Sequence, residues 1–297
     1  MEELKFAGFV MTYERATILL ETIDEIFNQS ILPNKLLIVD NSETYETQYK
    51  LESLNDPRIE YYRVGYNSGP AGAAAIGLKI LSSQGYDWIY WGDDDDPPIF
   101  KNTFEVLLKI ALSNQNCGCV GANGNYFSKL TSFISRPTNE ELEGEGLLSV
   151  DTIAGGMTKI VNGNMVLNYN IFPEEKLFFS FEELEFDIKI KKIGYSLLVD
   201  KSFYLQHRHF HNRIVLPPKS LRKKSDNALR REYYAVRNYM YILYKNKFYL
   251  ANFVFFSYYS LKSIANYKFG LAYGNKTFLN VLRAFKDFIF GNYGKTL

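Results

Sequence analysis

Apolar and polar positions alternate in blocks along the first 120 residues of the chain. An apolar run at residues 6–11 is followed by a segment, 16–28, whose large aliphatic side chains recur at helical spacing. An alanine-rich helix is predicted to end near Leu81, and further short apolar runs predict strands at 36–39, 59–64 and 88–91. This alternation of strand and helix predicts an α/β fold with a mostly parallel sheet and helices on both of its faces.

Polar residues stand at or just after the ends of these predicted strands. They are Thr12, Asp40, Asn67 and Asp93. Parallel sheets bind their ligands beyond the carboxyl ends of the strands. We therefore expect four separated segments to converge on one crevice.

The pattern is less regular from residue 123 to about residue 165. The acidic, glycine-containing stretch 139–146 predicts a mobile surface loop. A helix is predicted from Glu182, with Gly194 as its C-cap, and a strand follows at 196–199. The remainder of the chain is predicted to be a helical tail.

Charge and cysteine content exclude several classes of protein. The formal charge of +1 comes from 34 basic and 33 acidic residues, so no global field favours nucleic acid. Cys117 and Cys119 have no matching His or Cys cluster, which argues against a zinc site and against a disulfide framework. The amino terminus has no signal-peptide pattern and no apolar run approaches the length of a membrane span, so we expect a soluble or peripheral protein in a reducing cytosol.

The most informative chemical feature is a run of four carboxylates, Asp93 to Asp96, directly after a predicted buried strand. Such neighbours repel one another unless a cation neutralises them, which predicts a site for a hard divalent metal. Alternate positions project to the same side of an extended chain, so Asp93 with Asp95, or Asp94 with Asp96, would bind the ion together. A solvated acidic loop is the alternative interpretation.

Two helix starts carry further candidate chemistry. The turn from Gly69 to Gly72 lets backbone amides approach a phosphate closely at the start of a helix, although many glycine-rich turns are only turns. Glu182, Glu183 and Glu185 lie in the first turn of a later helix. They are candidates for catalysis, or they simply complement the helix dipole.

In combination these segments resemble the GT-A glycosyltransferases of family 2, especially the rhamnosyl- and galactofuranosyltransferase-like members of bacterial polysaccharide assembly. The resemblance covers roughly residues 6–245. The aspartate run with Pro98 matches the family's Asp-x-Asp-x-x-Pro when Asp93 and Asp95 take the two aspartate positions. Three further motifs of the first half match: Thr12-Tyr13-Glu14-Arg15 for Thr-Tyr-Asn-Arg, Val39-Asp40-Asn41-Ser42 for Val-Asp-Asn-Gly/Ser, and Asn67-Ser68-Gly69-Pro70-Ala71-Gly72 for Asn-x-Gly-x-Ala-Gly.

The second half of the resemblance begins with Phe181-Glu182-Glu183-Leu184-Glu185, which is similar to Phe-Glu-Asp-x-Asp/Glu. The register continues to Lys189 and to Gly194-Tyr195, and His207 stands where the family usually has a histidine. Tyr233-Tyr234-Ala235-Val236-Arg237-Asn238 matches the Tyr-Tyr-x-x-Arg-Asn opening of the C-terminal helices.

The resemblance implies an inverting, metal-dependent enzyme that moves a sugar from a nucleotide diphosphate to a hydroxyl group. It implies that Glu183 is the catalytic base and that Asp93, Asp95 and His207 hold Mn²⁺ or Mg²⁺. By the same carry-over, the donor-binding residues are Thr12, Tyr13, Arg15, Asp40, Asn67, Gly69 and Asp94, and the acceptor-side residues are Asn162, Asn164 and Glu182. The implied organisation is a GT-A catalytic domain at 1–215, with a nucleotide-binding half at about 1–120 and an acceptor half at about 121–215, and a helical region at 216–297.

Some positions depart from the family pattern or leave a choice open. Glu14 and Ala75 replace common asparagines, so contacts to the base and ribose are expected to differ, and Glu183 replaces the commoner aspartate. His209 and His211 compete with His207 as the imidazole ligand of the metal.

The tail after residue 230 mixes many Tyr and Phe residues with Lys and Arg. This composition favours helices that lie on an anionic membrane, and the alternative is a helical core with a dimer contact. With a lipid-linked glycan as the acceptor, we expect the enzyme in the cytoplasm at the inner face of the cell membrane.

Three alternatives concern the reaction. UDP-galactofuranose, UDP-galactose and dTDP-rhamnose are all open as the donor. A nucleotidyl- or phosphoryl-transfer enzyme would use the aspartate run for two metals, but the chain lacks a Walker Gly-Lys-Ser/Thr motif. A non-catalytic glycan-binding protein on the same fold is the third alternative.

Overall fold

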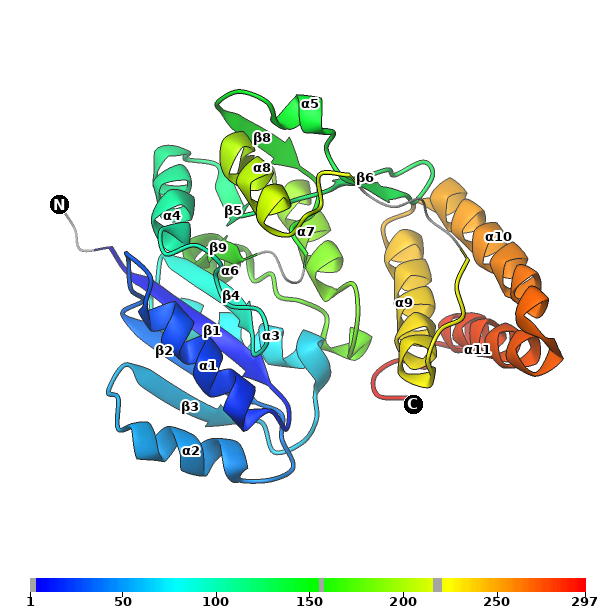
Figure 1. Cartoon of the computed structure of the whole chain (residues 1–297), viewed down its shortest axis with the longest axis horizontal. Coiled ribbons are helices and arrows are strands. Elements are labelled where there is room, and N and C mark those ends of the chain that lie inside the picture. Colours follow the sequence, from blue (N-terminus) through cyan, green and yellow to red (C-terminus); the bar gives the residue numbers. More distant parts are fainter. Residues whose placement is uncertain (1–3, 155–157, 216–220) are drawn as a thin grey trace.

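The computed structural model describes residues 4–154, 158–215 and 221–297. Within them an eight-stranded sheet has the order β3-β2-β1-β4-β9-β5-β10-β8 (Figure 1). Its strands are β1 (Phe6–Thr12), β2 (Lys35–Asp40), β3 (Ile59–Arg63), β4 (Trp88–Asp93), β5 (Cys117–Gly121), β8 (Leu147–Val150), β9 (Lys159–Asn162) and β10 (Ser196–Asp200). A separate hairpin pairs β6 (Tyr126–Phe127) with β7 (Ile134–Ser135).

The sheet is mixed: one half consists of parallel strands, and the other half also contains antiparallel strands. Strands β3, β2, β1 and β4 run parallel to one another, whereas β9 is antiparallel to both β4 and β5, and β8 is antiparallel to β10. The central strands of the parallel half are mostly apolar because both of their faces are covered: all seven residues of β1 are buried, whereas the edge strand β3 is only partly covered. The predicted α/β class with a mostly parallel sheet is therefore confirmed.

Helices alternate with the strands as the sequence predicts. Those of the first half are α1 (Ala16–Phe27), α2 (Glu46–Leu54), α3 (Gly69–Ser83) and α4 (Thr103–Ser113). Those that follow are α5 (Asn139–Leu142), α6 (Gly163–Tyr169), the 3₁₀ turn η1 (Glu175–Leu177), α7 (Glu182–Lys192) and α8 (Lys201–Phe210). Cys117 and Cys119 are free thiols buried in β5.

The stretch 139–146 is more ordered than a mobile loop, and that prediction is corrected. It begins with α5, in which Thr138 and Glu141 form a reciprocal capping box. Leu142 at the end of this turn is fully buried in the core. The capping pattern Thr-x-x-Glu was present in the sequence, but the many charged residues around it favoured a loop.

The tail forms a three-helix lobe beside the sheet, seen from yellow to red in Figure 1. It consists of α9 (Asp226–Lys245), α10 (Tyr249–Ala265), the 3₁₀ turn η2 (Asn266–Phe269) and α11 (Leu271–Phe290). Three aromatic residues of α9, Tyr233, Tyr234 and Tyr239, are buried in a core shared with α7, α10 and α11, whereas Tyr244 is exposed. For most rings of α9 this burial agrees with the alternative interpretation, a helical core, and contact of the tail with a membrane or a second subunit stays a prediction. The predicted domain boundary at 215/216 adjoins residues 216–220, which lie outside the described residues.

Candidate active site

The carboxyl ends of neighbouring strands bring the predicted site residues to one edge of the sheet. The β1–β2 register pairs Thr12 with Asp40, and the β1–β4 register pairs Met11 with Asp93. Asn67 lies in the loop that connects β3 to α3. The four segments therefore meet at one edge, as expected from the order of strands and helices.

The aspartate run is held in place by residues that follow β1. The Thr12 hydroxyl donates a hydrogen bond of 2.7 Å to Asp94, and the Arg15 guanidinium donates one of 3.0 Å to the other oxygen of the same carboxylate. Arg15 also forms an ion pair with Asp95. Asp94 is thus buried and saturated with donors, whereas Asp93 and Asp95 remain exposed.

Asp93, Asp94 and Asp95 form a group with the donor atoms that a metal needs. Each offers a carboxylate oxygen, and these atoms all lie within 4.8 Å of one another. Crowding by surrounding protein atoms, with the charges of Asp94 and Asp95 next in importance, raises the pKa of Asp93 to about 6 even though its side chain still reaches solvent. Burial, followed by the charge of Asp95, likewise raises the pKa of Asp96 to about 6. Oxygen ligands in an electrostatically crowded group fit a hard divalent cation.

A cavity of about 480 Å³ opens beside the aspartate group. Six of the seven predicted donor-binding residues line it together with Asp93 and Asp95: these six are Thr12, Tyr13, Arg15, Asn67, Gly69 and Asp94. Its remaining wall includes Phe178 and Phe179 and, from α9, Asn227, Arg230, Arg231 and Tyr234. We call this space the donor cavity.

Asp40 does not line the donor cavity. It is fully buried, and its carboxylate accepts hydrogen bonds from the Tyr61 hydroxyl (2.9 Å) and from the Ser42 amide (2.8 Å). Its neighbour Asn41 lines the cavity instead, and the Asn41 side chain bonds the Ser68 hydroxyl at 2.7 Å.

Gly69 occupies a position that only glycine fits. Its φ is +70°, and a Cβ atom there would lie 2.1 Å from the carbonyl oxygen of Phe178. The start of α3 is therefore pressed against the segment that precedes α7. The glycine allows this close approach without a steric clash.

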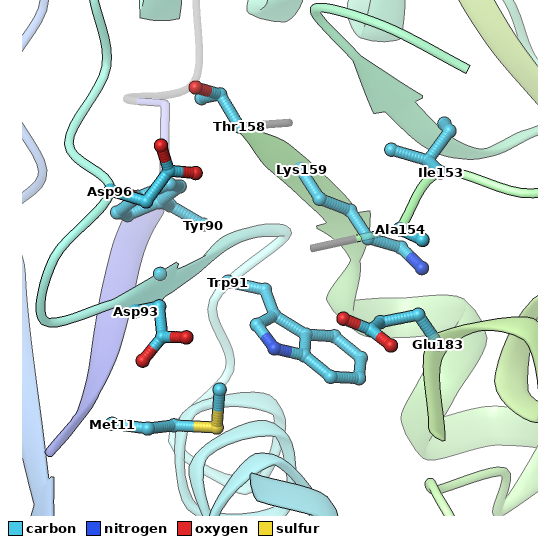
Figure 2. Close-up of a pocket in the computed structure, with 11 residues that line it drawn as sticks. Met11, Tyr90, Trp91, Asp93, Asp96, Ile153, Ala154, Thr158, Lys159 and Glu183 are labelled. Carbon is cyan, nitrogen blue, oxygen red and sulfur yellow. The ribbon is translucent and has the colours of Figure 1, made fainter. Parts of the chain in front are cut away.

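A second, smaller pocket of about 30 Å³ adjoins the aspartate run (Figure 2). Figure 2 shows the carboxylates of Asp93 and Asp96 on one side of it and that of Glu183 on the other, with the Trp91 ring between them. We call it the reaction pocket. It brings the predicted base and the predicted metal ligand Asp93 to opposite walls of one space.

The three glutamates at the start of α7 have different surroundings. Glu182 is buried with one oxygen that has no hydrogen-bond partner among the described residues, and burial, followed by the charge of Glu183, raises its pKa well above the ordinary value. Glu185 is buried on another side, where it forms ion pairs with Lys189 (2.9 Å) and Lys245 (3.1 Å). Of the three, only Glu183 lines the reaction pocket.

A buried ion pair at the wall of this pocket was not predicted from the sequence. Lys159, in β9, contacts Asp187 of α7 at 2.5 Å, and its ammonium group lies 5.0 Å from the centre of the Trp91 ring. Asp187 also accepts hydrogen bonds from the Thr152 hydroxyl and the Ile153 amide. The sequence feature that could have indicated this pair is the lysine directly before the apolar residues Ile160 and Val161, because a charge in a buried strand needs a partner.

His207 lies beside the loop that follows the aspartate run but is not a member of the aspartate group. The Phe100 and Phe203 rings pack edge-on against its imidazole at 4.9 and 4.8 Å. Neither ring nitrogen has a hydrogen-bond partner in the described part of the chain, and burial lowers the pKa of His207 to about 4, so the ring is neutral. His209 and His211, by contrast, are exposed.

The structure does not bring Asn162 and Asn164 to the aspartate group. Because β9 runs antiparallel to β4, Asn162 pairs with Trp88 at the opposite end of that strand from Asp93. The Asn162 side chain caps α6 by accepting from the Met165 amide at 2.8 Å. Asn164 donates to Asp87 at 2.8 Å.

Comparison with known proteins identifies the class of protein. Residues 9–172, more than half of the chain, match the model of glycosyl transferase family 2. The chain belongs to this family, and the predicted class of enzyme, a glycosyltransferase, is confirmed at that level.

The curated relatives share one activity by name. Galactofuranosyltransferase GlfT1 of Mycolicibacterium smegmatis is 24% identical over 196 residues, which cover 62% of this chain and 65% of the relative. GlfT1 of Mycobacterium tuberculosis H37Rv is 32% identical over 112 residues, which cover 37% of this chain and 36% of the relative. The chain thus spans less than two thirds of the length of these relatives.

Solved structures share the fold at low sequence identity. The mannosyltransferase PcManGT from Pyrobaculum calidifontis, solved with GDP-Man and Mn²⁺, gives a TM-score of 0.55 at 14% identity over 97% of this chain and 88% of that one. S. aureus TarS 1-349 with UDP gives 0.52 at 15% identity over 97% and 92%. GalNAc-T7, solved with UDP, GalNAc and Mn²⁺, gives 0.56 at 14% identity over 67% and 43%. The predicted GT-A fold is confirmed by these likenesses.

Proposed function

We propose that the protein transfers a sugar from a nucleotide diphosphate to a hydroxyl group, with inversion at the anomeric carbon. One observation carries the proposal: the aspartate group borders both the donor cavity and the reaction pocket, and Glu183 faces Asp93 across the latter. A cavity of about 480 Å³ suits a ligand of nucleotide size. A donor held there would place its sugar toward the reaction pocket.

Mn²⁺ or Mg²⁺ would be held by Asp93 and Asp95, with His207 as the candidate imidazole ligand. When bound, the ion supplies Lewis-acid stabilisation of the departing diphosphate. The exposed oxygens of the two aspartates and the unpartnered nitrogens of His207 support this assignment.

The protein's own groups would bind the donor and remove the proton. Tyr13 and Asn67 line the donor cavity where a base or ribose would lie, and Gly69 at the start of α3 presents backbone next to a phosphate. Arg15 and Thr12 hold the Asp94 carboxylate in place, and this would orient the neighbouring residues Asp93 and Asp95 toward the metal. Glu183 would accept the proton of the acceptor hydroxyl as that oxygen attacks the anomeric carbon from the face opposite the leaving group. Attack from that face inverts the configuration.

UDP-galactofuranose is the donor that the names of the curated relatives favour. UDP-galactose and dTDP-rhamnose are the alternatives. A screen of these nucleotide sugars for transfer and hydrolysis, with Mn²⁺ and with EDTA, tests the proposal. Release of nucleoside monophosphate instead of diphosphate would favour nucleotidyl or phosphoryl transfer. Binding without turnover on any donor or glycan acceptor would favour a non-catalytic glycan-binding protein.

Calorimetry of UDP and dTDP binding tests the metal separately. We expect binding to depend on the ion and Asp95→Asn to lose most of the metal-dependent part. Equal affinity with EDTA and with Mn²⁺ would refute the assignment of the aspartates as ligands.

The base is tested by a matched pair of variants on the same helix. Glu183→Gln should keep the fold and nucleotide binding while lowering kcat by about 10²- to 10⁴-fold, the usual cost of removing a general base. Glu185→Gln removes a carboxylate whose ion pairs lie outside the reaction pocket, so its effect should fall on stability. Turnover lost in Glu185→Gln and kept in Glu183→Gln would reverse the assignment.

We further propose that the lobe docks on an anionic membrane through α10 and α11, next to a lipid-linked glycan acceptor. Both helices expose apolar side chains along an outer strip: Leu250, Phe253, Leu261 and Ile264 on α10, and Leu271, Leu279, Leu282, Ile289 and Phe290 on α11. Residues 246–297 contain seven basic residues and a single acidic one, Asp287, which is buried. Exposed apolar strips with a one-sided positive charge are typical of helices that lie in a membrane interface. Within the residues that the structure describes, no helix is both long and apolar enough to cross a bilayer.

Flotation with liposomes of phosphatidylglycerol and phosphatidylcholine tests the docking surface. Leu279→Glu on α11 should abolish flotation, whereas Leu112→Glu on α4, which is equally exposed at 60%, should not. Binding should also weaken with salt because the attraction is partly electrostatic. A protein that never floats, and whose tight dimer is broken by Leu279→Glu, would show that the strip is a subunit interface.

A further inference from the structure

Asn238 on α9 binds three backbone carbonyls of the segment that leads into α7. Its side-chain amide donates to the carbonyl oxygens of Leu177 (2.8 Å), Phe179 (2.7 Å) and Ser180 (3.0 Å). The side-chain oxygen of Asn238 accepts from Nε of Arg237 at 3.0 Å, which orients the amide so that its NH₂ group faces the segment. Asn238 is fully buried, so these bonds do not compete with water.

The segment that Asn238 holds has an unfavourable backbone. Phe178, Ser180 and Phe181 all have positive φ angles, of 63°, 74° and 69°. Residues with side chains rarely adopt this conformation, and it persists only when the surroundings impose it. Asn238 supplies that constraint through the three carbonyls.

The same segment connects the donor cavity to the reaction pocket. At one end Phe178 lies against Gly69, accepts a hydrogen bond from the Ala71 amide (3.3 Å) and lines the donor cavity. At the other end Phe181 is the N-cap residue of α7, two residues before Glu183. A displacement of the segment would therefore move the donor turn and the proposed base relative to each other.

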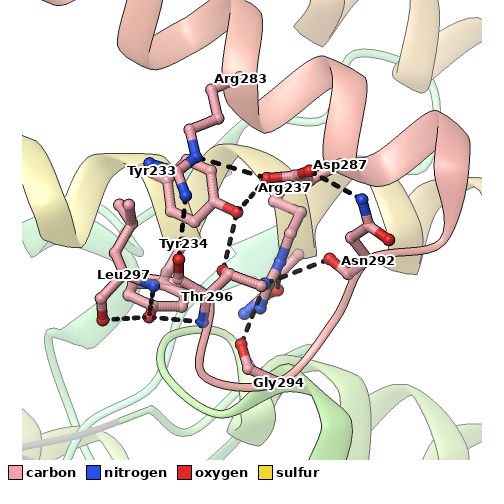
Figure 3. Close-up of polar contacts among 10 residues, drawn as sticks. Tyr233, Tyr234, Arg237, Arg283, Asp287, Asn292, Gly294, Thr296 and Leu297 are labelled. Atoms are coloured by element: carbon pink, nitrogen blue, oxygen red, sulfur yellow. Dashed lines mark hydrogen bonds and ion pairs between the residues drawn. The ribbon is translucent and has the colours of Figure 1, made fainter.

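Arg237 links the segment to the stretch that follows α11, and Figure 3 shows its hydrogen bonds to that stretch. One guanidinium nitrogen donates to the Leu177 carbonyl at 3.1 Å. Another donates to the Gly294 carbonyl (3.1 Å) and to the Thr296 hydroxyl (2.9 Å), in the stretch that follows α11. The Gly294 amide in turn donates to the Lys176 carbonyl at 2.7 Å. The lobe thus holds the segment at several points.

We propose that Asn238, supported by Arg237, is a positioning residue that fixes the distance between the donor turn at Gly69 and the base Glu183. It lines neither the donor cavity nor the reaction pocket among the described residues, so it acts through the segment 177–181. This inference rests on the proposed role of Glu183. It also assigns the lobe a part in catalysis, in addition to membrane docking.

Two variants and one control test the proposal. Asn238→Ala removes the three hydrogen bonds, and Arg237→Lys keeps the charge but loses the forked geometry. Asn280→Ala is the control, because the Asn280 amide also donates to a backbone carbonyl of the lobe, that of Leu229 at 2.9 Å, but does not touch the segment. All are assayed well below their own melting temperatures.

We expect Asn238→Ala to lower kcat by about 10²-fold, the effect of a displacement of about 1 Å at a reacting group. The KM for the donor should change by less than tenfold, Arg237→Lys should show a milder loss of kcat, and Asn280→Ala should retain normal kcat. If Asn238 acts through Glu183, the double variant Asn238→Ala/Glu183→Gln should be no slower than Glu183→Gln alone. Losses of kcat that multiply in the double variant would overturn the proposal.

Hydrogen exchange separates this inference from the proposed function. In Asn238→Ala, backbone amides of residues 177–185 should exchange at least tenfold faster, while those of β1 and β4 keep their protection. Unchanged exchange at 177–185 would overturn the positioning role whatever the activity. Faster exchange with full kcat would overturn it as well. A wild-type protein that transfers no sugar from any donor would instead refute the proposed function, and the exchange result would still decide whether Asn238 holds the segment.

Discussion

Replacement of Lys159 by methionine is expected to destabilise the protein by about 3 kcal/mol at pH 8. Lys159 and Asp187 are both buried, with exposures of 5% and 0%, and lie 2.5 Å apart. Removal of one partner from a buried ion pair typically costs about 3–5 kcal/mol, because the other charge is left without compensation. Asp187 would keep its bonds to Thr152 and Ile153, which places the expected loss at the lower end of that range.

The loss should depend on pH. Burial already raises the pKa of Asp187, while Lys159 opposes that rise. Without Lys159 the pKa of Asp187 in the folded protein rises further, whereas in the unfolded chain the same carboxyl keeps a pKa of about 4. Between these two pKa values the folded state holds a proton that the unfolded state has released. Stability then falls as pH increases through the folded pKa, and the destabilisation by Lys159→Met should be smaller at pH 5 than at pH 8.

Urea unfolding at both pH values measures the effect. The double variant Lys159→Met/Asp187→Asn, which removes the charge but keeps an acceptor for the Ile153 amide, should recover at least about 1 kcal/mol of the loss at pH 8. Lys35→Met is the control, since its ion pair with Glu60 is partly exposed and should contribute less than about 1 kcal/mol. A loss below about 1 kcal/mol for Lys159→Met at pH 8, or one that does not vary with pH, would refute the reasoning.

Three further predictions follow from single positions. Gly69→Ala should weaken UDP binding at least tenfold, measured by calorimetry, because the new Cβ would lie 2.1 Å from the Phe178 carbonyl oxygen. Gly65→Ala is the control and should not weaken binding, because Gly65 also has a positive φ but has open space around it. The raised pKa of Glu182 makes the folded state lose stability as pH rises, so Glu182→Gln should reduce the decline in stability between pH 5 and pH 8. Thermal unfolding at several pH values measures this decline, and an unchanged slope would contradict the prediction. Asn162→Ala should cost about 1 kcal/mol of stability through loss of the α6 cap and leave kcat unchanged, and a tenfold fall in kcat would support the predicted acceptor-side role instead.

The sequence predicted the parallel half of the fold because buried parallel strands are continuous apolar runs. Residues 6–11, 36–39 and 88–91 show this pattern, and the polar residues just after them then fall at one edge of the sheet. The position of β9 could not be predicted in this way. Periodicity does not give the direction in which a strand pairs. The antiparallel insertion of β9, which places Lys159 beside Trp91 and Asn162 far from the aspartate group, could therefore not be predicted from the sequence.

Other parts of the site depend on contacts between distant segments. The burial of Asp40 depends on Tyr61, and Asp94 is a structural anchor only because Arg15 and Thr12 reach it. Tyr233, Tyr234 and Tyr239 of α9 are core residues because they pack against α10 and α11, which composition alone does not reveal. Motif matches identify which residues converge, but the partners of each side chain follow from the folded chain.

The one-sided charge of residues 246–297 makes the molecule a strong electric dipole. The first 245 residues contain 27 of the 34 basic and 32 of the 33 acidic residues, a formal charge of −5, against +6 for the remainder. A protein with a net charge of only +1 is weakly attracted to an anionic surface overall. The separated charges would nevertheless exert a torque that turns the α10–α11 side toward that surface. At the proposed anionic membrane, orientation would therefore precede contact, and the isoelectric point of about 7.6 understates how strongly the protein responds to an electric field.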